Sequence, residues 1–448
     1  MIFVKQIIKL IFIIAFFRGF LETYLNITPE LSRSLCEVPI LLLMMYVFVS
    51  QFSKLKVPGL IYLLIFVLIS VISKFSNNMT FLQFLAFIRH YLIGIIFFYL
   101  ILNLNIAEKD LKSIWKLVLF LIIVQIPIAV VKLLTMGAAE TPMIGSIANL
   151  GGSISTILPM LGTVIFASYY FFYGERKNLL IIVGLLFCGF VGLKRAISIY
   201  LPLTFIITFL SYHFLEKKKN IASLFASNSV VFIMIMTPIC FYLLVRLSPS
   251  LNQENQIWGS FDPGFTIDYM QSYETRSDYN ELLGNRLEGT GRYNAWQAAQ
   301  SFIQTSRYSY FKGIGPGYIE SSALGGADEA LSLISLGYGV AMIGGVRIFL
   351  QIGLIGLAAF LFFHVKIFMQ ILRKLQTRVH KSNNDVFVFI AFVSFFVFFI
   401  DILTYSPTML IEPAIGFTFY FILALALKLN SNKNAIIVRK LTWLKCQN

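Results

Sequence analysis

Long runs of Phe, Leu, Ile and Val alternate with short polar segments along most of this 448-residue chain. The runs approach the roughly 20 residues that an α-helix needs to cross a bilayer. They are continuous and lack the two-residue alternation of transmembrane β-strands, so the pattern predicts helices. It predicts twelve spans, at approximately 7–26, 36–53, 57–73, 81–104, 114–134, 155–173, 179–194, 196–214, 224–246, 347–371, 386–404 and 412–428. The expected fold is an all-α polytopic membrane protein.

The pattern changes once, in a polar segment rich in Tyr, Asn and Gly. This segment divides the chain into three parts. Residues 1–246 hold the first nine predicted spans, residues 247–346 form one large loop, and residues 347–448 hold three further spans and a basic tail.

Two shorter patterns stand out within the loop. Apolar residues at helical spacing predict an amphipathic helix over 292–303, with Trp296, Ala299, Phe302 and Ile303 on one face. The glycines that follow, in the sequence GIGPGY, predict a tight loop. No Lys-Ser or Lys-Thr pair follows them, so they are weak grounds for a phosphate-binding loop. Residues 327–345 are expected to form a helix or a re-entrant piece.

Composition and charge support a membrane protein. Hydrophobic residues make up 58% of the chain and charged residues only 13%, which a water-soluble fold could not bury. The net charge of +15 comes mainly from short loops and follows the positive-inside rule, so nucleic acid is not an expected partner. The basic residues of the short outside segments are few: Arg33, Lys74, Lys132, Lys194 and Arg195. Both termini are therefore expected inside and the large loop outside.

Charged residues within the predicted spans are expensive to bury, so their depth is informative. Most of them fall in the outer half of the bilayer, and most are cationic: Arg18, Glu22, Arg89, His90, Lys132, Lys194, Arg195, Arg246, Arg347 and Asp401. Because guanidinium groups suit phosphate oxygens, the pattern favours a site for an anion such as a lipid-linked pyrophosphate.

Plainer interpretations of the same residues remain open. Arg18 and Glu22 could form a structural ion pair, and Arg195 could reach lipid headgroups. Arg89 and His90 could line a water-filled cleft. The Tyr and Trp residues of the loop, among them Trp296, could form an interfacial belt.

Three stretches resemble the O-antigen polymerase and O-antigen ligase superfamily of bacterial polysaccharide assembly. GLKRAIS (192–198) is similar to its Arg-containing motif at an outer helix turn. GTGRYNAW (289–296) followed by GIGPGY is similar to its G-R-x3-W … G-x-G-x-aromatic stretch. RIFLQIGLIGLAAF (347–360) is similar to the Gly-Leu-Ile-Gly helix after its loop.

The resemblance implies a metal-independent glycosyltransferase without cofactors in the bacterial cytoplasmic (inner) membrane, with its loop periplasmic or extracellular. Its donor would be an undecaprenyl-pyrophosphate-linked oligosaccharide, and its partners would be membrane lipid and the chain-length regulator and flippase of the same pathway. Arg195 and Arg292 would stabilise charge on the departing pyrophosphate. Substrate-binding candidates around them are Lys194, Arg89, Arg276, Arg286, Arg347, Tyr293 and Trp296.

The general base is undecided. Ligases of this group carry a His just before the Gly-Leu-Ile-Gly helix, but the corresponding stretch here, YGVAMIGGVR (338–347), has none. His90 is the histidine expected on the outer side, whereas His213, His364 and His380 are expected near the cytoplasm. The base could be His90 or a carboxylate such as Glu288 or Asp278, or none could be needed. The missing His favours a polymerase of repeat units; a ligase to lipid A core or a lipid-linked oligosaccharide flippase are the alternatives.

Overall fold

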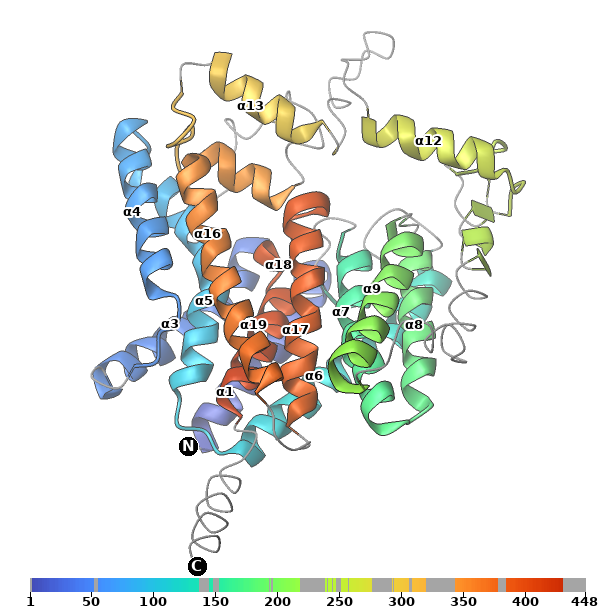
Figure 1. Ribbon diagram of the computed structural model, residues 1–448, viewed down its shortest axis with the longest axis horizontal. Coiled ribbons are helices and arrows are strands. Elements are labelled where there is room, and N and C mark those ends of the chain that lie inside the picture. Colours follow the sequence, from blue (N-terminus) through green and yellow to red (C-terminus); the bar gives the residue numbers. More distant parts are fainter. Residues whose placement is uncertain are drawn as a thin grey trace, which may run out of the picture.

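The computed structural model describes most of the chain as helices packed side by side (Figure 1). The described residues are 2–51, 55–136, 145–147, 153–192, 194, 196–217, 238–239, 241–243, 245–246, 251–256, 258–275, 292, 294–305, 308–319, 343–377 and 384–429. The apolar helices are α1 (Ile2–Phe16), α3 (Pro29–Gln51), α4 (Leu60–Ser76), α5 (Phe81–Asn103), α6 (Glu108–Met136), α7 (Ile154–Tyr173), α8 (Lys177–Val191), α9 (Ala196–Tyr212), α16 (Gly344–Gln376), α17 (Asp385–Ile400) and α19 (Pro413–Lys428).

Seven helical segments of the described chain are long and apolar enough to cross a membrane. They are Leu31–Ser50, Phe81–Asn103, Glu108–Thr135, Ile154–Tyr173, Ala196–Leu215, Gly344–Gln376 and Asp385–Tyr405, and three shorter apolar helices accompany them, Leu60–Ser76, Lys177–Val191 and Pro413–Lys428. The chain is therefore an all-α protein of polytopic membrane character, while the number twelve stays a prediction. The expected ninth span, 224–246, lies mostly outside the described residues.

The expected first span, 7–26, is not one helix. It breaks at Phe17 into α1 and the short helix α2 (Arg18–Tyr24). The break places Arg18 at the start of α2, where its side chain is completely buried. A single turn of the backbone thus directs a charged residue into the protein interior, and hydropathy alone does not reveal it.

The centre of the bundle is formed by α17 and α19. Every residue of α19 from Pro413 to Ala426 is buried, and α19 packs against α5 and α17. Aromatic rings fill these interfaces: Phe398 stacks on Phe419 with ring centroids 4.8 Å apart. A helix that is apolar on all sides is stable only when it is surrounded by other helices, and this explains its central position.

The two ends of the bundle differ in character. One end carries α12 (Pro263–Thr275) and α13 (Ala295–Thr305), and we call it the loop end (Figure 1). At the opposite end lysines bind carboxylates and helix-terminal carbonyls: Lys5 lies 2.7 Å from Asp110, and Lys374 donates to the carbonyl of Ala426 at 2.7 Å. These lysines belong to the segments predicted inside, so the observed arrangement is consistent with the predicted topology, and the side of the membrane stays a prediction.

The glycine loop has a structural role at the loop end. Its backbone bonds to α16, with Ile314 N donating to Leu350 O at 2.7 Å and Gly315 N donating to Gln351 O at 3.0 Å. Those carbonyls are available because α16 breaks at Gly353, whose φ of 68° and ψ of −171° are not helical. Gly313 also has a positive φ of 71°, and a Cβ there would meet the backbone of Leu350 and Gln351. The tight loop is confirmed, and its glycines allow two backbones to touch.

The predicted amphipathic helix is confirmed as α13. Ala295, Ala299 and Ile303 lie on its completely buried face. The Trp296 indole donates to the carbonyl of Leu403 at 3.2 Å, and its ring lies over Gly345 at the start of α16. Helix α13 is thus docked on the membrane helices. The expected helix or re-entrant piece at 327–345 lies outside the described residues except at its last three positions.

Candidate functional site

Arg292 lies at the junction between α13 and the membrane helices. Its Nε donates to the carbonyl of Tyr405 at 3.1 Å, and its guanidinium carbon lies 4.7 Å from the centroid of the Tyr405 ring. Tyr405 in turn places its hydroxyl 2.9 Å from Oγ1 of Thr156 in α7 and packs edge-on against Tyr200 of α9, with centroids 5.4 Å apart. The Arg292 guanidinium therefore rests on a tyrosine that also contacts α7 and α9.

Tyr405 itself is held by a network of short polar contacts. It ends a π-helical turn, η5 (Asp401–Tyr405), that continues α17 and leads into the short helix α18 (Thr408–Ile411). Asp401 is completely buried; its carboxylate accepts from the hydroxyl of Ser406 at 2.5 Å and from the backbone N–H of Met409 at 2.7 Å. Thr408 donates to Ser153 at 2.7 Å. Asp401 therefore fixes the turn that positions Tyr405.

Several candidate residues from the sequence lie outside the described residues: Arg195, Arg276, Arg286, Glu288 and Tyr293. Helix α9 nevertheless begins at Ala196, directly after Arg195. Its Tyr200 stands about one turn further along the helix and touches the same tyrosine that Arg292 contacts. The segment that follows Arg195 and the residue Arg292 thus approach Tyr405 from two sides.

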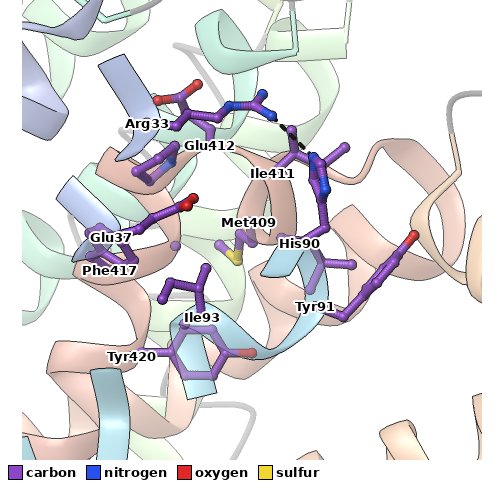
Figure 2. Close-up of a pocket in the computed structure, with 14 residues that line it drawn as sticks. Arg33, Glu37, His90, Tyr91, Ile93, Met409, Ile411, Glu412, Phe417 and Tyr420 are labelled. Carbon is purple, nitrogen blue, oxygen red and sulfur yellow. Dashed lines mark hydrogen bonds between the residues drawn. The ribbon is translucent and has the colours of Figure 1, made fainter. Parts of the chain in front are cut away.

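A second polar region opens near this junction, as a cleft between α3, α5 and the α18–α19 connection (Figure 2). Its empty volume, including open solvent, is about 390 Å³. In Figure 2 the Arg33 guanidinium points toward the imidazole of His90, and Tyr420 lies at the other end of the cleft. The polar lining residues are Arg33, Glu37, His90, Tyr91, Glu412 and Tyr420.

Arginines and glutamates are paired around this cleft. Arg18 contacts two carboxylates, Glu22 at 2.8 Å and Glu412 at 3.2 Å. Arg89 contacts Glu37 at 2.5 Å. The sequence suggested a mainly cationic outer layer, but here the carboxylates offset the guanidinium charges, and Arg89 is engaged by Glu37. The structural ion pair between Arg18 and Glu22 is confirmed, and it extends to a third member, Glu412.

His90 is engaged through both ring nitrogens. Its Nδ1 lies 2.9 Å from the carbonyl of Ala86, and its Nε2 lies 3.0 Å from Nη1 of Arg33. A carbonyl can only accept and a guanidinium can only donate, so Nδ1 carries the proton and Nε2 accepts. His90 therefore orients Arg33, and it could take a proton from a substrate only if the contact with Arg33 were broken.

The remaining described candidates have clear locations. Trp296 is half-buried and docks α13, and its indole N–H is used by Leu403. Arg347 lies in the first turn of α16, and its carbonyl accepts from the side chain of Gln351. Lys194 lies just before α9, where its backbone N–H donates to Gly189 O at 3.3 Å. All three lie at helix ends or starts near the loop end.

Sequence reasoning missed Glu37 and Glu412 as members of the cleft and gave Arg33 no role. Glu412 lies directly before the last apolar run, where an acidic residue looks like an ordinary start of a helix. Its partner Arg18 is almost four hundred positions away. His364 lies 3.0 Å from the hydroxyl of Tyr420, one of the lining residues, and its location near the cytoplasmic side stays a prediction.

Comparison with known proteins adds no assignment, because neither a model of a known family nor a curated protein matches this sequence. Function must therefore be argued from the two polar regions themselves.

Proposed function

We propose that this chain polymerises lipid-linked oligosaccharide repeat units at the outer face of a bacterial cytoplasmic membrane. The donor glycan leaves undecaprenyl pyrophosphate and joins a new repeat unit. The observation that supports this most directly is the position of Arg292, which is held over Tyr405 at the loop end and beside the start of α9. A pyrophosphate attached to a membrane lipid would reach that depth.

The reaction assigns Arg292 an electrostatic role. A hydroxyl oxygen of the acceptor attacks the anomeric carbon of the donor sugar, and the bond from that carbon to the pyrophosphate oxygen breaks. The bonding electron pair stays on the pyrophosphate, whose negative charge grows as it departs. Guanidinium groups of Arg292 and Arg195 would stabilise that charge. The proton of the acceptor hydroxyl passes to a base, for which Glu288 is the candidate beside Arg292 in the sequence.

A rigid support makes Arg292 suitable for this role. Its Nε is used by the Tyr405 carbonyl, and its plane rests against the Tyr405 ring. Tyr405 is fixed by Thr156 and by the network around Asp401. A charge that is already in place needs no reorganisation when the leaving group departs, and this property makes electrostatic catalysis efficient.

The test is the replacement Arg292→Ala in a host that makes the polymer. Removing a positioned charge of this kind costs about 10²–10³ in rate, so single lipid-linked repeats should accumulate and long polysaccharide should disappear from gels. Arg246→Ala is the matched control, since Arg246 also donates Nε to a carbonyl, that of Gly259, and lies near Tyr242 and Trp258. It should leave the chain-length ladder unchanged.

A normal ladder from a stably inserted Arg292→Ala protein would refute the proposal. Loss of surface polysaccharide together with intracellular accumulation of lipid-linked repeats would point to the flippase alternative. Long polymer that remains on its carrier lipid would point to the ligase alternative.

A further inference from the structure

Asp401 is a completely buried carboxyl group without a cation beside it. No arginine, lysine or histidine among the described residues forms an ion pair with it, whereas Glu37 and Glu412 are each paired with an arginine. An ionisable group inside a membrane domain is expensive to keep and commonly marks a functional site, including sites that move protons. Fixing the turn of η5 does not require an acid, because an amide side chain could make the same contacts.

A chain of hydroxyl groups leads from Asp401 to the start of α7. Ser406 Oγ lies 2.5 Å from Oδ1 of Asp401 and 2.6 Å from Oγ1 of Thr408. Oγ1 of Thr408 lies 2.7 Å from Oγ of Ser153. Ser406 and Thr408 are buried, whereas Ser153 is partly exposed. Short hydrogen bonds therefore connect the buried acid to a partly exposed serine without interruption.

The hydroxyl chain of Ser406, Thr408 and Ser153 can be arranged in two ways, because each hydroxyl has one proton to donate. When Asp401 is ionised, it accepts from Ser406, and Ser406 accepts from Thr408. Thr408 then accepts from Ser153. When Asp401 is protonated, it donates to Ser406, and every following bond is reversed, so that Thr408 donates to Ser153. A proton that enters at Ser153 therefore converts the first arrangement into the second, and a proton appears on Asp401.

The outer end of the hydroxyl chain lies beside the Arg292 junction. Ser153 precedes Thr156 by three positions at the start of α7, so their Cβ atoms are about 5–6 Å apart. Thr156 bonds the hydroxyl of Tyr405, whose ring lies against the Arg292 guanidinium. A sugar hydroxyl that attacks a donor held by Arg292 would arrive in the same region as Ser153.

We propose that Asp401 receives the proton of the acceptor hydroxyl through the hydroxyl chain. The proposal rests on the proposed function, because that reaction supplies the proton. The acceptor oxygen bonds to the anomeric carbon, and the pyrophosphate leaves with the electron pair of its broken bond. The acceptor proton moves to Ser153, and each hydroxyl passes its own proton inward until Asp401 is neutral. Reversal of the chain then returns the proton to water. This assignment replaces Glu288, the base that the sequence alone offers.

Asp401→Asn separates proton transfer from structure. Its amide nitrogen can donate to Ser406 as the protonated carboxyl does, and its amide oxygen can still accept from Met409 N, so the turn is retained. The amide cannot take up a proton. The measurement is transfer between lipid-linked repeat units by the full chain in lipid nanodiscs. General base catalysis contributes about 10²–10⁴ in rate, so kcat should fall by such a factor while KM and Tm stay near their normal values.

Asp385→Asn is the matched control. Asp385 is also completely buried and lies at the opposite end of α17, so the same change there should leave kcat as it is. A second pair of variants tests the hydroxyl chain itself. Thr408→Val keeps the shape of the side chain but removes the hydroxyl, and it should lose transfer. Thr408→Ser keeps the hydroxyl and should regain most of that loss.

Normal kcat in a stably inserted Asp401→Asn protein would overturn the inference. An equal loss in Asp385→Asn, or a loss that follows a lower Tm, would also overturn it. If Asp401→Asn does not insert stably, the two Thr408 variants decide: equal transfer by both would refute the hydroxyl chain.

The design separates this inference from the proposed function. If Arg292→Ala and Glu288→Gln abolish transfer while Asp401→Asn transfers normally, Glu288 is the base and only the role of Asp401 is wrong. If Asp401→Asn loses kcat while Arg292→Ala gives a normal ladder, the proposed role of Arg292 is wrong and the proton path stands.

Discussion

At the scale of single residues, the most unusual feature is Arg18, a completely buried guanidinium with two carboxylate neighbours. Burying an isolated charge is very costly, and pairing reduces this cost only while all partners are present. Glu22 also accepts from the hydroxyl of Ser32 in α3. The polar cluster around the Arg18 charge therefore connects α2, α3 and the start of α19.

Replacing Arg18 by Met should destabilise the protein strongly. It leaves the buried Glu412 and the mostly buried Glu22 without their cation, and breaking a buried pair in this way costs about 3–5 kcal/mol. Lys5→Met is the control, because its pair with Asp110 is partly exposed and solvent-screened and therefore contributes little to stability. Thermal unfolding in detergent should show a large drop in Tm for Arg18→Met and a small one for Lys5→Met. Similar shifts for both variants would contradict the buried-network description.

At the scale of elements, the joint between the glycine loop and α16 brings two backbones into direct contact. Ser73 of α4 donates to the carbonyls of Lys312 and Gln351, at 2.6 and 3.2 Å, so α4 joins the same contact. The side chain of Gln351 accepts from Gly317 N at 2.7 Å and donates to the hydroxyl of Tyr91 at 3.2 Å. One break in a helix thus brings α4, α5, α16 and the loop together.

Gly353→Ala should disrupt this joint. Its φ of 68° and ψ of −171° belong to a region that is essentially limited to glycine, and a Cβ would meet the backbone of Phe311. Gly174→Ala is a matched control because its φ is also positive, 74°, but a Cβ there meets nothing within 4 Å. We expect a loss of about 1–2 kcal/mol for the control and a larger loss for Gly353→Ala. Equal shifts in Tm would show that close packing at Gly353 is unimportant.

At the scale of the whole molecule, α12 and α13 mark the loop end (Figure 1), and the opposite end carries Lys5, Lys374 and Lys428. Lys374 and Lys428 both donate to carbonyl groups at the C-terminal ends of helices, where positive charge is favourable. From the positive-inside rule we predict that this end faces the cytoplasm.

This orientation can be tested by labelling single cysteines introduced into a cysteine-free background. Gln300 is exposed on α13, and Lys177 is exposed at the start of α8. A thiol reagent that does not cross membranes should label Gln300→Cys in intact cells and Lys177→Cys only after permeabilisation. The reverse result would place the loop end in the cytoplasm and rule out the proposed reaction at the outer face.

Hydropathy predicted the helices well because a backbone within a bilayer must satisfy its hydrogen bonds internally, so each long apolar run becomes a helix. Each expected span except the ninth overlaps an apolar helix of the described chain. Breaks at Phe17 and Gly353 were not predicted, since each depends on a tertiary contact. The backbone of Phe311 packs against Gly353, and the sequence around Gly353 does not predict that contact.

The candidate site was less accessible to sequence reasoning. Charge within an apolar run identified Arg18, Arg89 and His90 as unusual, and it located them near one end. Their partners could not be inferred, because Glu37 and Glu412 meet those arginines only through the packing of α3, α5 and α19. A count of cations along the chain suggested an anion site, whereas the folded chain pairs two of these cations, Arg18 and Arg89, with carboxylates.

The contact of α4 with the joint between the glycine loop and α16 also constrains the order of assembly. The inward face of α4 carries Ser70 and Ser73, and its main neighbour α16 begins about 270 residues later in the chain. At the usual speed of a ribosome, α4 waits roughly 15–50 seconds in the bilayer before that neighbour is made. The hydroxyl of Ser70 needs no partner from α16 during this time, because it donates to Phe66 O within α4. Nascent α4 must therefore tolerate lipid on both faces, and a charged substitution at Ser73 would hinder biogenesis before the final contact could form.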